Sequence, residues 1–381
     1  MSLRKSLWLS ATQKPVSLHS KHGKTAVIPG MEPTGHYWFA LGKFLQDNGM
    51  KPVHVNPHHV KKSKELDDNN PNKNDRKDPK TIAALVNEGR FSYPYIPTGI
   101  YAEIRSLSNL RFQTQEELTR IKNRIARWFS IYFPEYKDVY VDLKAVSGRM
   151  VLKAAPLPED IVKLGAEGVN QIWRKAKLRG AGMKRAKTLV SVAEHSIGSK
   201  EAPEAARIEL KNLLNDMDVY AARLEELLRS IEEKLKEIPY IDKLMAIKGI
   251  GLVTVSGFIA EVGDIGRFDN PKQLQKLAGY AIVANDSGKH NGESRISYRG
   301  RKRLRYVLYE AAISLIGKNA EFREIHEYYR GRKENPLKKM QSVVAIACKV
   351  IRVFYAILTK GVDYDAEKLI GDIRRPQMQA A

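Results

Sequence analysis

Residues 210–239 read LKNLLNDMDVYAARLEELLRSIEEKLKEIP and form the clearest periodic element of the chain. Apolar side chains recur every seven residues, at Leu210, Met217, Leu224, Ile231 and Ile238. A second apolar position of the same seven-residue repeat is occupied by Leu213, Tyr220 and Leu227. Pro239 ends the pattern because proline lacks the amide hydrogen that a helix interior needs. This pattern predicts a long helix, either in a coiled coil between chains or packed on a helix of its own chain.

Further helices are expected on both sides of this element. Between Tyr101 and Phe133, apolar residues recur at helical spacing, at Ile104, Leu107, Leu110, Leu118, Ile121, Ile125 and Trp128. Residues 156–200 read as short helices with glycine-rich breaks, and residues 196–203 as a linker. Downstream, residues 240–360 predict a small domain of helices joined by glycine turns.

The pattern before residue 100 is different, because short strands alternate with helices. Residues 25–28 and 51–55 read as buried strands, and a helix with Pro33 in its first turn lies between them. The polar stretch 61–74 predicts a loop, and Asp78–Pro79 begin another helix. Strands and helices in this order predict an α/β unit with parallel strand pairing.

The expected fold class is therefore α/β plus α, divided into five segments. These are a basic N-terminal segment (1–24), an α/β domain (25–100), a helical and coiled-coil region (101–240), a small, mostly helical C-terminal domain (241–360) and a tail (361–381).

The chain carries a large excess of positive charge. Its 381 residues include 65 Lys and Arg against 43 Asp and Glu, a formal net charge of +22. Such an excess favours a polyanionic partner, of which nucleic acid is the commonest. An anionic membrane is the rival partner, but we find no basic amphipathic helix to support it and expect no membrane-spanning run. We therefore predict a cytoplasmic protein that binds DNA.

The cysteine content excludes two kinds of site. Cys348 is the single cysteine, so neither an internal disulfide nor a cysteine-rich zinc site can form. It ends the apolar stretch VVAIAC at residues 343–348, which predicts a thiol on a buried helix face.

Three carboxylates form the first candidate site. Glu32 directly follows a predicted strand, and Asp75 and Asp78 lie at the mouth of a predicted helix. Carboxylates gathered at the end of a parallel sheet suit phosphoryl transfer, because Mg²⁺ prefers oxygen ligands and clamps the attacking and leaving oxygens. Acidic residues at a helix start are more often caps that favour the helix dipole, so both interpretations stay open.

The second candidate is the segment Lys248-Gly249-Ile250-Gly251 between two apolar stretches. This pattern is typical of a helix-hairpin-helix, in which Gly249 and Gly251 permit a tight turn. Such a turn brings backbone N–H groups and a helix N-terminus against a DNA phosphate, a contact that carries no sequence information. A simple helix C-cap is the alternative.

Two further stretches complete the candidates. Ser287 lies in the polar segment 285–289, which alone predicts a turn and does not identify a nucleophile. After it, a block without acidic residues contains Arg295, Arg299, Arg301, Lys302, Arg303 and Arg305. This basic block is either solvated surface or a face that contacts nucleic-acid phosphates, and the nearby Tyr298 and Tyr306 favour the second.

Several of these stretches together resemble one protein family. They are GMEPTGHYW at 30–38, VNP at 55–57, KNDRKD at 73–78 and IKGIG at 247–251, followed by Arg267–Phe268, Leu277–Gly279, Ser287–Gly288, Gly300 and Leu304–Arg305. In this order and spacing they resemble the DEDD transposases of the insertion-sequence one-hundred-and-ten family, relatives of the Piv DNA invertase. The resemblance extends from about residue 25 to about residue 360.

The resemblance implies a RuvC-like, RNase H-type N-terminal domain whose acidic tetrad binds Mg²⁺. Glu32, Asp75 and Asp78 match its second, third and fourth acidic positions. Ser287 matches the nucleophilic serine of the C-terminal domain, which in the family holds DNA as a phosphoserine, so strand exchange needs no external energy source. The resemblance also implies a homo-oligomer with a composite site and, in some members, a guide RNA from the element itself.

The chain departs from the family at the first acidic position, because residues 1–31 contain no Asp or Glu. We therefore expect weakened metal binding. Our hypothesis for the missing residue is a 5′-truncated or frameshifted copy of the gene, or a reading frame that starts too late. Three functions compete: a recombinase, an inactive transposase that only binds DNA, and, by fold analogy, a junction-resolving nuclease that uses metal-activated water. DNA binding without a covalent adduct distinguishes the second, and Mg²⁺-dependent cleavage that survives Ser287→Ala distinguishes the third.

Overall fold

A computed structural model describes residues 27–33, 37–68, 78–283, 286–287, 290–291 and 295–379. The chain divides into two compact units, Met1–Pro97 and Thr98–Ala381. The basic segment 1–24 of the sequence analysis lies outside the described residues.

The first unit contains the α/β part of the chain. Its elements are β1 (Gly30–Met31), α2 (Tyr37–Asp47), β2 (Val53–His54), α3 (Pro57–Asp68) and α4 (Asp78–Asn87). The two strands are parallel, with Gly30 opposite Val53, as the sequence predicts. The first strand was expected at residues 25–28, but Val27 and Ile28 are not in a strand and β1 begins at Gly30. Glu32 therefore follows a strand directly, as expected.

Helix α3 occupies much of the stretch 61–74 that was expected to be a loop. Its start is fixed by Asn56, whose Oδ1 accepts a hydrogen bond from the His58 amide at 2.9 Å. Pro57 takes the first helical position, where its missing N–H costs nothing. The prediction of a loop was wrong because it treated Asn56–Pro57 only as a strand stop, although an N-cap residue before proline also signals a helix start.

A small core joins the strands of the first unit to α4. Val55, Val60 and Leu85 are buried in it. A Cβ atom on Gly30 would lie 2.7 Å from Val86 Cγ2, so β1 approaches α4 more closely than any larger residue allows. This close approach places β1 against the Ile82 and Val86 side chains of α4.

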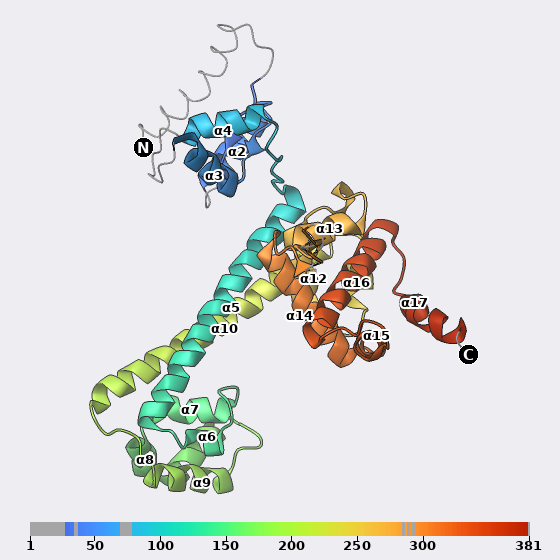
Figure 1. Cartoon of the computed structure of the whole chain (residues 1–381). Helices are drawn as coiled ribbons and strands as arrows, with labels where there is room; N and C mark the ends of the chain where they lie inside the picture. The colour runs from blue at the N-terminus through green and yellow to red at the C-terminus, as the bar shows by residue number, and fades with distance from the viewer. Residues whose placement is uncertain are drawn as a thin grey trace. The chain divides into compact units, whose positions relative to one another are not determined.

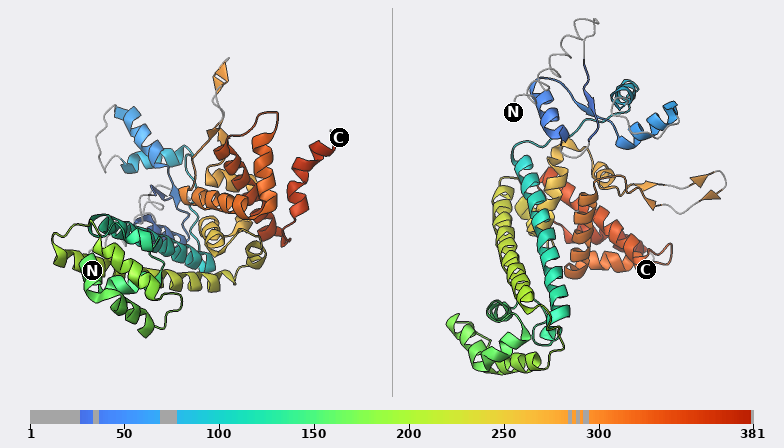
Figure 2. Two further views of the ribbon diagram at one scale, coloured as in Figure 1. Left: turned by 90° about the horizontal axis from the view of Figure 1, so that it is seen from below. Right: turned by 90° about the vertical axis from the view of Figure 1, so that its left-hand side faces the viewer.

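The second unit is built on two long helices, α5 (Gly99–Tyr132) and α10 (Pro203–Leu235), which lie side by side (Figures 1 and 2). The indole Nε1 of Trp128, late in α5, donates to the carbonyl oxygen of Ala206, early in α10, at 3.0 Å. Towards the other end, Ile104 and Ile231 belong to one buried cluster. The helices are therefore antiparallel. This is the intrachain alternative for the heptad helix, and a coiled coil between chains stays a prediction.

The remaining elements gather at the two ends of this helix pair (Figure 1). The chain between α5 and α10 forms α6 (Tyr136–Val139), α7 (Val146–Ala154), α8 (Pro158–Lys175) and α9 (Met183–Glu194). After α10 come α11 (Ile241–Met245), α12 (Leu252–Val262), the 3-10 helix η1 (Ile265–Arg267), α13 (Pro271–Ala278), β3 (Ile282–Val283), β4 (Asp286–Ser287), β5 (His290–Asn291), β6 (Arg295–Ile296), α14 (Lys302–Lys318), α15 (Ala320–Gly331), α16 (Lys339–Lys360) and α17 (Ala366–Gln379). Helix α17 occupies most of the expected tail, and its Ile370 and Ile373 are buried.

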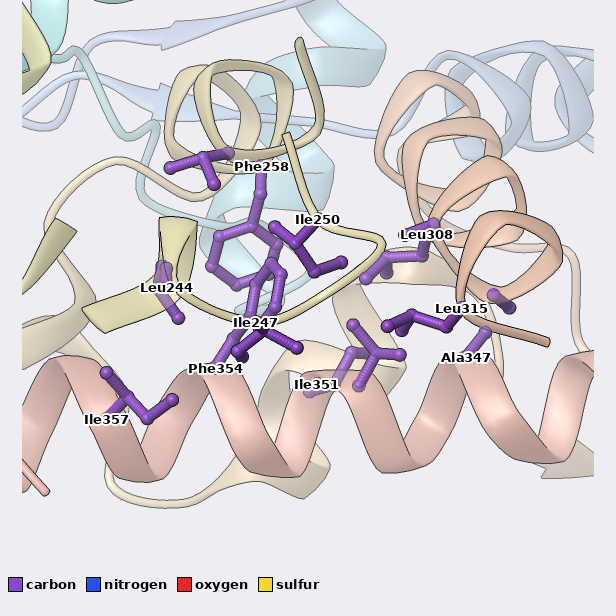
Figure 3. Close-up of a cluster of buried hydrophobic side chains, with 14 of the residues drawn as sticks. Leu244, Ile247, Ile250, Phe258, Leu308, Leu315, Ala347, Ile351, Phe354 and Ile357 are labelled. Atoms are coloured by element: carbon purple, nitrogen blue, oxygen red, sulfur yellow. The ribbon is translucent and has the colours of Figure 1, made fainter. Parts of the chain in front are cut away.

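Each end of the helix pair has its own hydrophobic core. The core around α6 to α9 contains the buried Trp128 and Trp173, and the Trp173 indole donates to the Ser147 carbonyl at 2.9 Å. In the C-terminal core, Phe258 of α12 meets Phe354 of α16 edge to face, with ring centroids 5.1 Å apart (Figure 3). Edge-to-face contacts of this kind add to the stability that ring burial provides.

Helix α16 runs through the C-terminal core. No run of membrane-spanning length was expected from the sequence, and this was wrong by length and composition, because an 18-residue apolar window within Lys339–Lys360 has a mean hydropathy of 1.9. Just over half of that apolar window, 56%, is buried inside the protein, as in the core helix of a globular domain. Cys348 lies on this helix, and burial raises the pKa of its thiol to about 11, as suits a protonated core thiol.

The expected linker 196–203 is held firmly against the end of α5. The Ser199 amide donates to the Ile131 carbonyl at 2.8 Å, and the Ile197 amide donates to Glu135 Oε1 at 2.9 Å. A Cβ atom on Gly198 would lie 2.1 Å from the carbonyl oxygen of Tyr132. Only glycine therefore allows this connection to lie so close to α5.

We expect Gly198→Ala to lower the free energy of unfolding by about 1–3 kcal/mol, since the backbone of Tyr132 cannot move away as a side chain can. Gly317→Ala is the matched control, because its Cβ would meet no atom within 4 Å and alanine favours the helix. Urea unfolding of the full chain measures both. Equal midpoints for the two variants would contradict the close packing of the connection.

The pH dependence of stability should report on His326 of α15, whose Nδ1 lies 2.8 Å from Ser342 Oγ of α16. Burial, and then Arg330, lowers the pKa of this imidazole from 6.5. As pH falls the unfolded chain therefore takes up the proton first, so the contribution of neutral His326 is present above about pH 6.5 and is lost below it. We expect thermal stability to fall more between about pH 7.5 and 5.5 in the wild type than in His326→Asn. A variant with the same pH dependence as the wild type would refute this assignment.

Candidate functional site

Glu32 lies at the end of β1, beside a surface cavity of the first unit. The side chain is half-buried. The cavity has a volume of about 680 Å³ and is lined by Glu32 from the strand side and by Pro79 and Ile82 from α4. The fold therefore brings Glu32 to the same cavity as the first turn of the helix that Asp78 begins.

Asp78 is the first residue of α4 and has a cation as its partner. Its Oδ1 accepts a hydrogen bond from the Nζ of Lys64 on α3, and both side chains are mostly buried. The position at a helix N-terminus also favours a negative charge. Sequence reasoning missed Lys64 because it placed this residue in a loop, and the N-cap pattern at Asn56–Pro57 is the signal that would have put it on a helix.

The carboxylates of Glu32 and Asp78 have the donor chemistry for a hard cation such as Mg²⁺, which prefers carboxylate oxygens as protein ligands. Two carboxylates do not complete such a site. Among the described residues, no three His, Cys, Asp or Glu side chains gather in a group that could hold a metal. The third expected ligand, Asp75, lies outside the described residues.

Ser287 belongs to the second unit, in a short strand where the sequence analysis expected a turn. Strand β4 pairs antiparallel with β5, which places Ser287 opposite His290. Strands β3 and β6 form a second antiparallel pair, with Ile282 opposite Ile296. The two pairs follow one another along an arm that projects from the helices (Figure 2). The sequence signal for this arrangement is Gly288-Lys289, a glycine-first dipeptide between two short strands.

The expected segment 248–251 forms a glycine turn between α11 and α12. Gly249 has φ +102°, a left-handed conformation that favours glycine, and Gly251 is the extended N-cap of α12. The Ser314 hydroxyl of α14 donates to the Gly249 carbonyl at 2.7 Å, so the first half of the turn is packed inside the unit. Lys248 and Gly251 are exposed, which leaves the N-terminus of α12 accessible.

Three cations of the basic block are engaged inside the protein. Arg301 donates to the Glu261 carbonyl at 2.7 Å and lies 3.4 Å from the Glu261 carboxylate. Arg303 donates to Asn109 and lies over the ring of Phe112 on α5. Arg305 donates to the carbonyl oxygens of Ala278 and Tyr298, at 3.1 and 3.2 Å.

The other three cations of the block, Arg295, Arg299 and Lys302, are exposed, and no ion pair involves them in the described parts of the chain. From the sequence, a nucleic-acid face was favoured over solvated surface for all six cations. The structure separates them into three that hold the fold together and three that are available to an external anion. Composition alone could not make this distinction, because the partners of Arg301 and Arg303 lie on distant segments.

Comparisons with known proteins give matches over two parts of the chain. Residues 241–330 match the family described as "Transposase IS116/IS110/IS902 family". Residues 11–134 match a DEDD transposase family of the IS110 type, described as "Transposase". The second match begins inside the basic segment that the sequence analysis set apart.

Individual relatives agree with these matches. The chain is 24% identical to the "Insertion element IS116 uncharacterized 44.8 kDa protein" of Streptomyces clavuligerus, over 75% of this chain and 71% of the relative. It is 23% identical to the "Insertion element IS900 uncharacterized 42 kDa protein" of Mycobacterium paratuberculosis, over 74% and 71%. It is also 23% identical to the "Transposase for insertion sequence element IS1111A" of Coxiella burnetii, over 88% and 78%. Both halves of the resemblance found in the sequence are thus matched independently, and the chain belongs to the IS110 family of insertion-sequence transposases.

Proposed function

We propose that this protein is a DNA transposase or site-specific recombinase that cuts and rejoins DNA through the hydroxyl of Ser287. The observation that carries the proposal is the pair of family matches, at residues 11–134 and 241–330. The first contains Glu32, Asp75 and Asp78, and the second contains Ser287. One chain therefore holds the residues for both parts of the reaction.

In the proposed reaction, Ser287 Oγ attacks the phosphorus of one phosphodiester. A serine–phosphate ester forms, one bond between phosphorus and a deoxyribose oxygen breaks, and that oxygen leaves with a proton. Attack on the phosphoserine by the deoxyribose hydroxyl of another strand reverses these changes and releases the serine. Because each step exchanges one ester for another, joining the new strands needs no nucleotide cofactor.

The acidic residues have a supporting role in this proposal. Glu32, Asp75 and Asp78 would hold Mg²⁺, which neutralises the charge that develops on phosphate during the transfer. The Lys64 ammonium group competes with a metal for the negative charge of Asp78. We propose an RNase H-like fold for the domain that carries them.

The proposed DNA contacts are to phosphates and not to base edges. In a helix-hairpin-helix, the turn at Lys248, Gly249 and Gly251 would present backbone N–H groups at the N-terminus of α12. Arg295, Arg299 and Lys302 would add phosphate contacts near Ser287 in the sequence. Further partners that we propose are a second copy of the chain and a guide RNA from the same element, and we place the reaction in the cytoplasm.

The alternative function is an inactive transposase that binds DNA without cutting it. Two observations favour it: residues 1–31 contain no acidic residue, and Asp78 is already paired with Lys64. Such a protein would keep its phosphate contacts and lose the covalent step. The two functions differ in whether a protein–DNA bond forms.

The purified protein is mixed with Mg²⁺, with labelled DNA from the ends of its element and with RNA transcribed from the flanking sequence. We expect a protein–DNA band that survives denaturation. Ser287→Ala should abolish the band, because the proposed phosphoserine cannot form without the hydroxyl of this residue. Ser297→Ala is the matched control, since that hydroxyl contacts the Gly279 carbonyl within the fold, and it should keep the band. Binding without a band in the wild type would establish the inactive alternative. Cleavage that survives Ser287→Ala would indicate a nuclease.

The ion pair on Asp78 predicts a response to Mg²⁺. If Asp78 binds the metal, Lys64→Gln removes a competing cation, and the Mg²⁺ concentration for half-maximal thermal stabilisation should fall about two- to fivefold, as expected for a pair contributing about 0.5–1 kcal/mol. Lys62→Gln is the control, because Lys62 pairs with Glu65 on the same helix. If both variants titrate like the wild type, Asp78 is only a helix-end residue held by Lys64.

A further inference from the structure

The end of α8, the following turn and the start of α9 form a strongly basic surface. Between Glu167 and Glu194 the chain has no acidic residue. The same stretch contains seven cations, namely Arg174, Lys175, Lys177, Arg179, Lys184, Arg185 and Lys187. All seven side chains are exposed. We call residues 174–187 the basic turn.

None of these seven cations takes part in an ion pair within the described residues, whereas cations elsewhere on the same end of the helix pair do. Arg207 pairs with both Glu159 and Asp160, and Lys153 pairs with Asp218. Arg185 lies 5.7 Å from the centre of the Tyr140 ring. The charges of the basic turn therefore repel one another without compensation, which favours a polyanion at this surface.

Two of the cations lie at a helix N-terminus, where the helix dipole disfavours positive charge. Lys184 and Arg185 lie in the first turn of α9, where there is no acidic residue. The positive end of the helix dipole disfavours cations at this position. Neighbouring helices follow the usual preference, since α8 begins with Glu159 and Asp160 and α10 with Glu204. Helix stability therefore does not explain the basic first turn of α9, but a bound anion would relieve the repulsion.

The backbone of the basic turn repeats the glycine turn between α11 and α12. Gly180 has φ +86°, and Gly182 is the extended N-cap of α9, just as Gly249 has φ +102° and Gly251 is the extended N-cap of α12. A Cβ atom on Gly180 or Gly182 would meet no atom within 4 Å. The turn is thus open on its outer side, and an approaching phosphate chain would meet no obstructing side chain at either glycine.

The basic turn lies far from the C-terminal core, at the opposite end of the α5–α10 pair (Figure 1). On α5, Ile104 of the C-terminal core and Trp128 of the other core are 24 residues apart, or about 36 Å at the rise of an α-helix. This is about one turn of B-DNA. The basic turn also lies outside both matched segments, 11–134 and 241–330.

We propose that the basic turn is a second DNA-binding surface, which holds the phosphate backbone of duplex DNA without reading its sequence. The inference rests on the proposed function, which supplies DNA as the partner. Exposed lysine and arginine side chains make the contacts, and the α5–α10 pair sets their distance from the C-terminal domain. DNA flanking the reacting site would thereby be held at the end of the helix pair opposite to that domain.

The test measures how DNA binding depends on salt. In the full-length protein, Lys184→Gln, Arg185→Gln and Lys187→Gln are combined, and binding to a duplex of about 30 base pairs of arbitrary sequence is measured between about 50 and 200 mM salt. Each lost phosphate contact lowers the slope of log affinity against log salt by about 0.9, so the triple variant should lose about 2–3 units. Each single substitution should lose about one.

The matched control combines Lys211→Gln, Arg229→Gln and Lys236→Gln. These cations are exposed on or just after α10, belong to no ion pair in the described chain, and lie among acidic residues. The control changes the net charge by the same amount, so its slope should stay close to that of the wild type. Unfolding midpoints of both triple variants should match that of the wild type, since no ion-pair partner is lost. If the basic-turn triple variant does not fold, the salt slopes of the three single variants are measured in its place.

The outcomes separate this inference from the proposed function. Equal slopes for the basic-turn variant and the control, with wild-type binding intact, would overturn the basic turn as a DNA-binding surface and leave the proposed function standing. Weakened binding of duplex RNA but not of duplex DNA would overturn DNA as the partner of this surface. No DNA binding by the wild type would overturn both proposals.

Discussion

The antiparallel contact between α5 and α10 is the interaction on which both cores of the second unit depend. The apolar residues of each helix are divided between two clusters, one with Ile104 and Ile231 and one with Trp128 and Leu210. Neither cluster can form unless the two helices lie in this register. In proteins most of the stability of a helix comes from packing of its apolar face, so the surface that α5 and α10 bury against each other stabilises both. The contact therefore fixes the fold and also sets the distance between the two ends of the unit.

The distribution of charge follows from how the cations are placed on this framework. Some are neutralised within the fold, such as Arg207 by Glu159 and Asp160 and Arg301 by Glu261. Others, including Lys302 and Lys184, stay exposed and unpaired among the described residues. Because ion pairs within the fold neutralise some of the cations, the excess positive charge, +22 in all, is concentrated on particular surfaces. These surfaces lie on both ends of the helix pair, which suits a long polyanion better than a small anionic ligand.

The candidate chemistry is divided between the two units. Glu32 and Asp78 belong to the first unit, where Glu32 lines a cavity and Asp78 begins a helix that lines it too, and Ser287 belongs to the second unit, on the projecting arm. In the proposed reaction the acidic residues and the serine act on the same phosphate. The arm, built from two short strand pairs, carries the serine outside the helical core.

Much of this could be read from local sequence. Apolar spacing predicted the long helices, Asp78–Pro79 predicted the start of α4, and the motifs at 30–38 and 247–251 identified the family that the comparisons match. Local patterns also misled where two signals competed. The pair Asn56–Pro57 both follows the end of a strand and begins α3. The polar residues around Ser287 suggested a turn where a strand pair forms.

The sequence by itself determined the helical periodicity, the excess of positive charge and the residue types available for phosphoryl transfer, because these depend on composition and on short-range spacing. Only the tertiary structure decided which surfaces those charges occupy. Arg303 is held on α5 by Asn109 and Phe112, and Asp78 is held by Lys64, and none of these pairings is visible in spacing along the chain. The physical reason is that the partner of a charged side chain is fixed by the packing of distant segments. For the same reason only the tertiary structure shows that α10 packs on α5 within the chain, a partner that its heptads did not identify.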